Sequence, residues 1–315
     1  MRTRTAGVKR VLRSRARVDV LSGQRYSSSW APTVTYTFER GTQSPLQVHL
    51  PDPKNLSGAH KDSRHEGWQA QCVQSKGVAD GTSLNVWPAA RVLSQYLVTN
   101  ADRLPAAPYV ELGCGLGLCG VTLAKLLAEN EGNAAAGTAP RMNTKAIVYC
   151  TDGDPEALSL LPSSAALNGV SEFIDCVLME YGNRDQARSL LELVNAGEPP
   201  RNEVLMATSA SEHRHGAAVS QHRPGLVIAS DVLYDLQAIE PLVETLWLLG
   251  APLSLLSFAP RHLDADFAGS QEIEVLIEVA KRRGFNIRRR LTHGPADRLW
   301  DSVIVMALER HSLQG

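Results

Sequence analysis

Three glycines at alternate positions, Gly113, Gly115 and Gly117, stand between a short apolar run and a helix-like stretch of the chain. Residues 109–112 have the length and apolarity of a buried strand, and apolar residues recur at helical spacing over 121–127. A backbone without Cβ atoms can approach a ligand closely, and the N–H groups of a following helix point into the same space. This stretch therefore predicts a strand, a glycine turn and a helix that together hold a cofactor.

Such a turn serves two classes of cofactor. The residues from Gly115 to Gly120 fit the dinucleotide fingerprint G-x-G-x-x-G, which is weak evidence on its own. Glu111 argues against a dinucleotide, because a diphosphate needs donors and positive potential, whereas a carboxylate at the strand end attracts a cation. The α-amino group and the sulfonium of S-adenosylmethionine carry such positive charge. Charge therefore favours S-adenosylmethionine, and a turn without any ligand is disfavoured because so many glycines cost stability.

Two acids follow the next apolar run. Residues 146–150 predict a buried strand, and Asp152 and Asp154 come directly after it. A carboxylate at the end of the second strand of a βαβ unit can accept hydrogen bonds from both ribose hydroxyls. The alternative is that an acid here caps the helix predicted over 155–167. We expect Asp152, which is nearer the strand, to bind the ribose and Asp154 to cap the helix.

Later strands end in further candidate side chains. Tyr181 follows the strand predicted over 173–179, and the end of a third strand borders the adenine in a doubly wound sheet. Asp231 and Tyr234 follow the strand predicted over 226–230, and they would share one face if the chain turned helical there. Both side chains would then project across the carboxyl edge of the sheet.

A tryptophan stands just ahead of another predicted helix. Trp87 precedes Pro88, and apolar residues at helical spacing continue to about residue 98. A tryptophan in this position is by default a core residue, but a ring at the mouth of a site can also pack on a cofactor.

Histidines and cysteines give little support for a metal. A His-x-His pair with a third histidine nearby could bind zinc, but His213, His215 and His222 lie in a polar stretch without a framing acid or cysteine. The five cysteines are odd in number, scattered and without a CxxC pair. That pattern predicts reduced thiols and no metal site.

The order of predicted elements gives an α/β fold: a doubly wound, mostly parallel, seven-stranded Rossmann-like sheet with helices on both faces. An N-terminal β-hairpin extension is predicted over 34–50, and the insertions at 131–145 and 184–223 are predicted as a surface loop and as one helix followed by polar chain. The remaining predicted elements are helices over 238–249 and 272–283 and strands over 253–258, 285–290 and 302–308.

Composition sets further limits. With 315 residues, a formal charge of −1 and 43% hydrophobic residues, the chain can build a sizeable core and gives no reason to expect nucleic acid or a membrane as partner. We divide it into residues 1–30, a basic segment interpreted either as a disordered tail or as a mitochondrial targeting signal, residues 31–83, an extension with the hairpin, and residues 84–315, the α/β domain that contains the glycine turn.

Three motifs fall in an informative order: VWPAARVLSQYL at 86–97, VELGCGLG at 110–117 and ASDVLYD at 229–235. Together they resemble the seven-β-strand S-adenosylmethionine-dependent methyltransferases, and within them the protein-lysine methyltransferases called methyltransferase family 16 or methyltransferase-like 21. The resemblance covers about residues 84–310. It implies S-adenosylmethionine as the cofactor and no metal.

The resemblance also assigns roles to residues. It implies that the cofactor contacts the tryptophan before the first helix (Trp87), the glycine turn (Gly113, Cys114 and Gly115) and the acid after the second strand (Asp152). It also implies contacts from the aromatic after the third strand (Tyr181) and from the residue before the D-x-x-Y motif (Ser230). Our own interpretation of the turn adds Glu111 and Gly117. The D-x-x-Y motif itself is Asp231 and Tyr234, and we expect both to orient an incoming amine. The chain departs from the family in having Tyr181 where tryptophan is usual and in its long insertions.

The expected reaction is methyl transfer to a lysine side chain of a protein substrate by a monomeric enzyme in the cytoplasm, with the nucleus as a further site and mitochondria as the alternative. Other readings stay open: a methyltransferase acting on protein arginine, a small molecule or RNA, a methyltransferase-like binding protein without turnover, and a nicotinamide-dependent oxidoreductase. The resemblance does not name the substrate.

Overall fold

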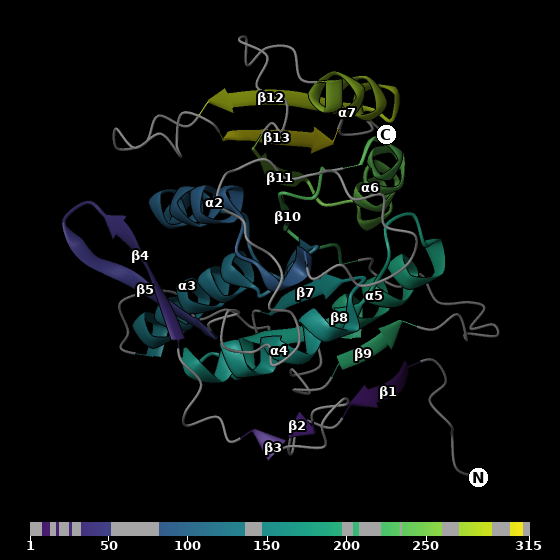
Figure 1. Cartoon of the computed structure of the whole chain (residues 1–315). Coiled ribbons are helices and arrows are strands. Elements are labelled where there is room, and N and C mark those ends of the chain that lie inside the picture. Colours follow the sequence, from purple (N-terminus) through teal and green to yellow (C-terminus); the bar gives the residue numbers. More distant parts are fainter. Residues whose placement is uncertain are drawn as a thin grey trace, which may run out of the picture.

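One nine-stranded sheet organises the chain in the computed structural model (Figure 1). The structure describes residues 8–12, 17–18, 25–26, 33–51, 82–135, 147–196, 204–207, 222–233, 235–259, 271–291 and 303–310. The strands lie in the order β1-β9-β8-β7-β6-β10-β11-β13-β12. Their bounds are β1 Val8–Leu12, β6 Tyr109–Leu112, β7 Val148–Asp152, β8 Ile174–Leu178, β9 Val204–Ala207, β10 Leu226–Ser230, β11 Leu253–Phe258, β12 Phe285–Leu291 and β13 Ile304–Arg310.

The six central strands from β9 to β11 pair in parallel, and the outer pairs β1–β9, β11–β13 and β12–β13 are antiparallel. The predicted seven-stranded sheet is present from β8 to β12, and β9 and β1 extend it beyond β8. All parallel strands end at the same edge of the sheet, and chain order reverses direction between β6 and β10. Ligands bind in α/β sheets at the carboxyl edge beside such a reversal.

Helices cover both faces of the sheet (Figure 1). The apolar residues of α2, α3 and α4 join one buried cluster, and those of α5, α6 and α7 join another on the opposite face. The helices are α2 Pro88–Thr99, α3 Leu118–Ala135, α4 Pro155–Leu167, α5 Arg184–Ala196, α6 Leu236–Leu249 and α7 Gln271–Arg282, with short 3-10 turns η1 Thr82–Leu84, η2 Ala101–Arg103 and η3 Ser171–Phe173.

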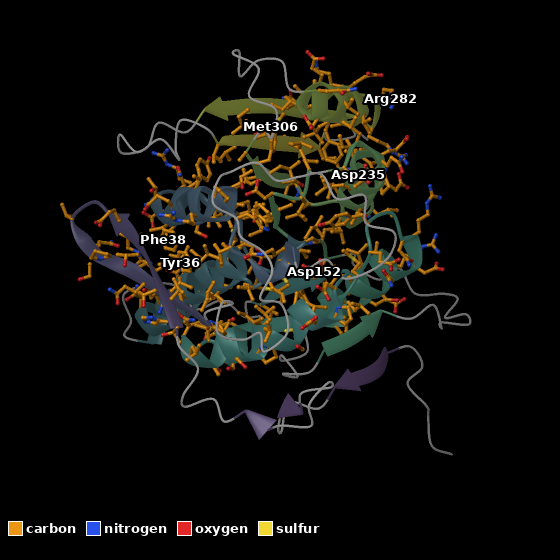
Figure 2. The ribbon with its side chains drawn as sticks, viewed as in Figure 1. Tyr36, Phe38, Asp152, Asp235, Arg282 and Met306 are labelled. Carbon is orange, nitrogen blue, oxygen red and sulfur yellow. The ribbon has the colours of Figure 1, made fainter. Side chains whose placement is uncertain are left out.

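A separate hairpin, β4 Thr33–Arg40 with β5 Gln43–Pro51, packs beside α2, α3 and α4. Figure 2 shows Tyr36 and Phe38 between this hairpin and the helices, and Phe38 is buried there. A side-chain amide pairs with the backbone of one residue on each edge of the hairpin. Gln95 of α2 accepts from Glu39 N (3.0 Å) and donates to Glu39 O (2.8 Å). Asn168 accepts from His49 N (2.9 Å) and donates to His49 O (2.6 Å), so the hairpin is fixed between two helices.

Two predictions about the insertions need correction. Helix α3 continues to Ala135, so residues 131–135 are helical and are not part of a surface loop. The second insertion contains β9 as well as the predicted helix α5.

Residues 1–30 contain β1 and a two-stranded pair, β2 Arg17–Val18 with β3 Arg25–Tyr26. Whether residues 1–30 are a targeting signal stays a prediction. Among the described residues, no helix combines the length and apolarity that crossing a membrane requires.

Candidate functional site

The glycine turn lies between β6 and α3 at the carboxyl edge of the sheet. Gly113, Gly115 and Gly117 have φ values of 64°, 51° and 81°, which favour glycine strongly. The turn is fixed to the neighbouring strand because Cys114 N donates to Thr151 O at 2.9 Å. Gly117 N then donates to Cys114 O at 2.7 Å, and α3 begins at the next residue. The strand, turn and helix predicted from the sequence are confirmed.

Two of these glycines are approached by oxygen atoms. The hydroxyl of Tyr181 lies directly against Gly113, where a Cβ would also be 2.8 Å from Val232 Cγ1. A Cβ on Gly115 would be 2.7 Å from the backbone oxygen of Ser83. Tyr181 therefore lies at the glycine turn, as expected for a residue beside the cofactor, and its packing on an adenine stays a prediction.

Gly117 also has a role in packing. A Cβ on Gly117 would collide with the side chain of Leu161 on α4. The space beside Gly117 is thus filled by the protein core, and the glycine allows α4 to pack against the turn. Contact of Gly113, Gly115 and Gly117 with the cofactor stays a prediction.

Glu111 also differs from its prediction. Its neighbours Val110 and Leu112 join the cluster under α5 to α7, so strand alternation turns Glu111 toward α3. The side chain is 1% exposed, and its carboxylate accepts from Gly120 N at 2.8 Å in the first turn of α3. Burial raises its pKa to about 8, which favours the neutral carboxyl more than in an exposed glutamate. Glu111 therefore supports the helix start and does not present a fixed negative charge to a ligand.

The two acids at the end of β7 have different contacts, and the cap predicted for one of them is confirmed. Asp154 caps α4, because its side chain accepts from Glu156 N at 2.8 Å. Asp152 is the last residue of β7 and lies near the centre of the molecule (Figure 2). Its carboxylate accepts from Gly115 N at 2.8 Å and from Asp154 N at 2.9 Å. Burial raises the pKa of Asp152, and these backbone donors oppose that effect.

Asp231 joins three elements. One carboxylate oxygen accepts from Ala89 N in the first turn of α2 at 2.8 Å, and the other accepts from Ala259 N, just after β11, at 3.0 Å. Its own N–H donates to Ser257 O at 2.8 Å. Asp231 is the non-glycine residue with positive φ, 53°, among the described residues. The chain is therefore not helical at Asp231, and the helical turn considered from the sequence is wrong; α6 begins only at Leu236.

Trp87 and Ser230 flank this junction. Trp87 is the N-cap of α2 and is half-buried. Ser230 ends β10, and its hydroxyl lies 3.8 Å from the thiol of Cys119 on α3. Cys119 also lies 3.3 Å from Ala90 O, so α2, α3 and β10 meet around one buried thiol. Tyr234 lies outside the described residues.

Sequence reasoning missed Ser83. It lies in η1, and its hydroxyl donates to Asp154 Oδ2 while its backbone oxygen faces Gly115. A lone serine in a turn-rich stretch carries no local signal, since the contact joins residues 71 positions apart.

The geometry fits S-adenosylmethionine. At the carboxyl edge Gly115 N donates to Asp152 and Gly113 lies against the hydroxyl of Tyr181, so the turn, the acid and the aromatic ring are brought together. Asp152 accepts from backbone N–H groups, and a carboxylate has about four acceptor positions, so it can still accept from a ribose hydroxyl. Carboxylates at Asp152 and Asp154 suit a cationic ligand better than a diphosphate. Asp152, Gly113 and Gly115 would hold the cofactor, with Tyr181 beside them.

No metal site emerges from the described part of the chain, where no group of three or more histidine, cysteine or acidic side chains is placed to bind an ion. His213 and His215 lie outside the described residues. Cys114, Cys119, Cys150 and Cys176 are buried free thiols, and burial raises the pKa of Cys150 well above its usual range.

Comparison with known proteins supports the sequence resemblance. Residues 71–196, less than half of the chain, match the family described as lysine methyltransferase. No curated protein matches the chain.

Similar solved structures include the Methanococcus jannaschii fibrillarin pre-rRNA processing protein, at 10% identity and a TM-score of 0.40, covering 94% of this chain and 88% of that one. The methyltransferase domain of bacterial CtHen1 has 11% identity and a TM-score of 0.42, with coverage of 71% and 97%. The O-methyltransferase TomG from Streptomyces achromogenes has 14% identity and a TM-score of 0.40, with coverage of 72% and 82%. Likeness at this level carries no argument about substrate. The segment that matches the lysine methyltransferase family, residues 71–196, contains Trp87, the glycine turn, Asp152 and Tyr181, so it includes most of the candidate cofactor site.

Proposed function

We propose that this chain transfers a methyl group from S-adenosylmethionine to a lysine side chain of a protein. The observation that supports the proposal is the match of residues 71–196 to the lysine methyltransferase family. The D-x-x-Y motif adds support from outside the matched segment, because its first residue, Asp231, directly follows β10 at the carboxyl edge that also carries the glycine turn, and Tyr234 completes the motif in the sequence.

Methyl transfer to lysine sets two requirements for the protein: handling of the amine proton and positioning of the amine nitrogen. S-adenosylmethionine, when bound, supplies an electrophilic methyl group, which passes to the lysine nitrogen while the sulfur keeps the electron pair of the broken C–S bond. A lysine amine has a reference pKa of about 10.4, so the protein must accept it as the neutral amine or help it to lose its proton. It must also hold the nitrogen in line with the methyl group, and positioning of this kind supplies much of the rate.

Asp231 is the residue we assign to amine orientation. Both of its carboxylate oxygens already accept from backbone N–H groups, which fixes the side chain between α2 and the end of β11. The remaining acceptor positions of a carboxylate can receive a hydrogen bond from an amine. A fixed acceptor loses little entropy when the substrate binds, so the backbone contacts would improve positioning. Tyr234 is the second residue we assign to this role.

We further propose a lysine-containing protein as the partner, with a monomeric enzyme acting in the cytoplasm. A net charge of −1 gives no general attraction for nucleic acid or for an anionic membrane surface. The target protein is unassigned.

Methyl transfer into a cell extract tests the proposal. The full chain is incubated with extract and S-adenosylmethionine labelled on the methyl group, with protease or ribonuclease treatment in parallel. The labelled product is then hydrolysed and its amino acids separated. We expect label that is sensitive to protease and elutes as methylated lysine. Label in methylated arginine, in RNA or in a small molecule would contradict the proposed substrate class.

A further inference from the structure

Ser83, Asp154, Asp152 and Gly115 form a closed ring of contacts around the acid that we assign to the ribose. The Ser83 hydroxyl donates to Asp154 Oδ2, and Asp154 N donates to Asp152 Oδ1 at 2.9 Å. Asp152 Oδ2 accepts from Gly115 N at 2.8 Å. Gly115 closes the ring, because the position where another residue would carry its Cβ faces the backbone oxygen of Ser83. Three separate parts of the chain, η1, the glycine turn and the end of β7, are joined here.

The bond from Ser83 is not needed for the fold of α4. Asp154 caps that helix with Oδ1, which accepts from Glu156 N at 2.8 Å, whereas Ser83 binds the other oxygen, Oδ2. Asp154 therefore has two separable functions. The contact between Ser83 and Asp154 connects η1 to the sheet edge without taking part in the helix cap.

Close packing against Gly115 gives the same segment a second fixed point. The nearest atoms to a Cβ at Gly115 all belong to the backbone of Ser83, with the oxygen at 2.7 Å and the carbonyl carbon at 3.6 Å. A backbone cannot move aside as a flexible side chain can. Glycine at position 115 is therefore favoured for two reasons: its φ is 51°, and a Cβ there would push η1 off the turn.

We propose that Ser83 is a positioning residue for the cofactor, which acts by holding η1 on the glycine turn and by fixing Asp154 and Asp152 at the ribose position. Loss of its hydroxyl frees η1 and loosens the ring. The cofactor then binds less tightly and leaves faster, while the rest of the fold is unaffected. This inference concerns the cofactor and is independent of which substrate is methylated.

Calorimetric binding of S-adenosylmethionine and of S-adenosylhomocysteine to the full chain tests the proposal. We expect Ser83→Ala to raise both Kd values about tenfold, which corresponds to about 1.4 kcal/mol. Ser83→Thr keeps the hydroxyl and should restore Kd to within about threefold of the wild type. Ser44→Ala, an exposed serine on β5, is the matched control and should leave Kd unchanged.

A double variant tests whether Ser83 acts through Asp154 or only by stabilising the fold in general. Asp154→Ser keeps a good N-cap residue but removes the oxygen that Ser83 binds. If Ser83 acts through Asp154, Ser83→Ala in the Asp154→Ser background should raise Kd little further. The melting temperature of cofactor-free Ser83→Ala should stay within about 2 °C of the wild type. An unchanged Kd for Ser83→Ala, or fully additive effects in the double variant, would overturn the proposal.

Discussion

Replacing Asp231 with alanine removes the acceptor for two backbone N–H groups at once, those of Ala89 and Ala259. A donor left unsatisfied costs about 1–3 kcal/mol, and the lower half of that range applies here because Asp231 is only half-buried and water can reach part of the site. Alanine also tolerates the φ of 53° less well than aspartate, at a cost of about 1 kcal/mol. We therefore expect Asp231→Ala to destabilise the chain by about 3–5 kcal/mol.

Thermal unfolding measures this effect. At about 2 °C per kcal/mol for a chain of this size, the melting temperature should fall by about 6–10 °C. Asp235→Ala is the matched control, because Asp235 caps α6 through a single acceptor for Gln237 N and its loss should cost about 1 kcal/mol. Asp231→Asn keeps one acceptor and a residue that tolerates positive φ, so it should fall between the two variants.

The same variants separate structure from catalysis. Measured well below the melting temperature, Asp231→Ala should still bind S-adenosylmethionine but should methylate its substrate much more slowly. If Asp231→Ala melted at the wild-type temperature, the structural reasoning would be refuted. If it bound cofactor normally and methylated at the wild-type rate, the orienting role would be wrong.

Three further predictions concern the turn and the hairpin. The pKa of Glu111 in the folded chain, about 8, lies above its ordinary value of 4.5, so the folded state binds more protons than the unfolded state between these values. Stability should therefore fall as the pH rises from about 4.5 to about 8. In melting curves recorded over this pH range, Glu111→Gln should flatten that fall. Gly117→Ala should lower stability by about 2–3 kcal/mol in denaturant titrations, because the new Cβ meets Leu161 at a φ of 81°, and an unchanged midpoint would contradict the packing role. Asn168→Ala leaves the backbone of His49 unpaired and should expose the hairpin to proteases sooner than the wild type, while equal cleavage rates would argue against the clamp.

Local signals explain why several elements could be predicted closely. Helix α4 begins and ends where the sequence indicates, because Asp154, Pro155 and Asn168-Gly169 each act on their own neighbours. Strand β10 is a continuous apolar run with the predicted bounds.

The predictions that need correction concern features that depend on contacts between residues far apart in the sequence. The sequence predicts Glu111 at a strand end facing a ligand, but the direction of its side chain depends on which face of the sheet buries Val110 and Leu112. Strand β9 is four residues long, and β1, its partner on the outer side of the sheet, lies almost 200 positions away, so neither strand has a strong local pattern.

In the candidate site too, features set by local sequence could be predicted and long-range contacts could not. The glycine turn and Asp152 could be predicted because each lies at the end of a strand, and these strand ends must reach the carboxyl edge. The bonds of Asp231 to Ala89 and Ala259 could not, because they join elements that only the folded sheet brings together. Ser83 was missed for the same reason.

The identity of the methylated atom tests the central claim most directly. Wild-type chain and Asp231→Ala are each incubated with cell extract and methyl-labelled S-adenosylmethionine, and the labelled protein is hydrolysed for amino-acid analysis. We predict that the wild type places the label on the side-chain nitrogen of lysine and that the variant places far less there. Label on any other acceptor, or equal lysine labelling by the two proteins, would contradict the account.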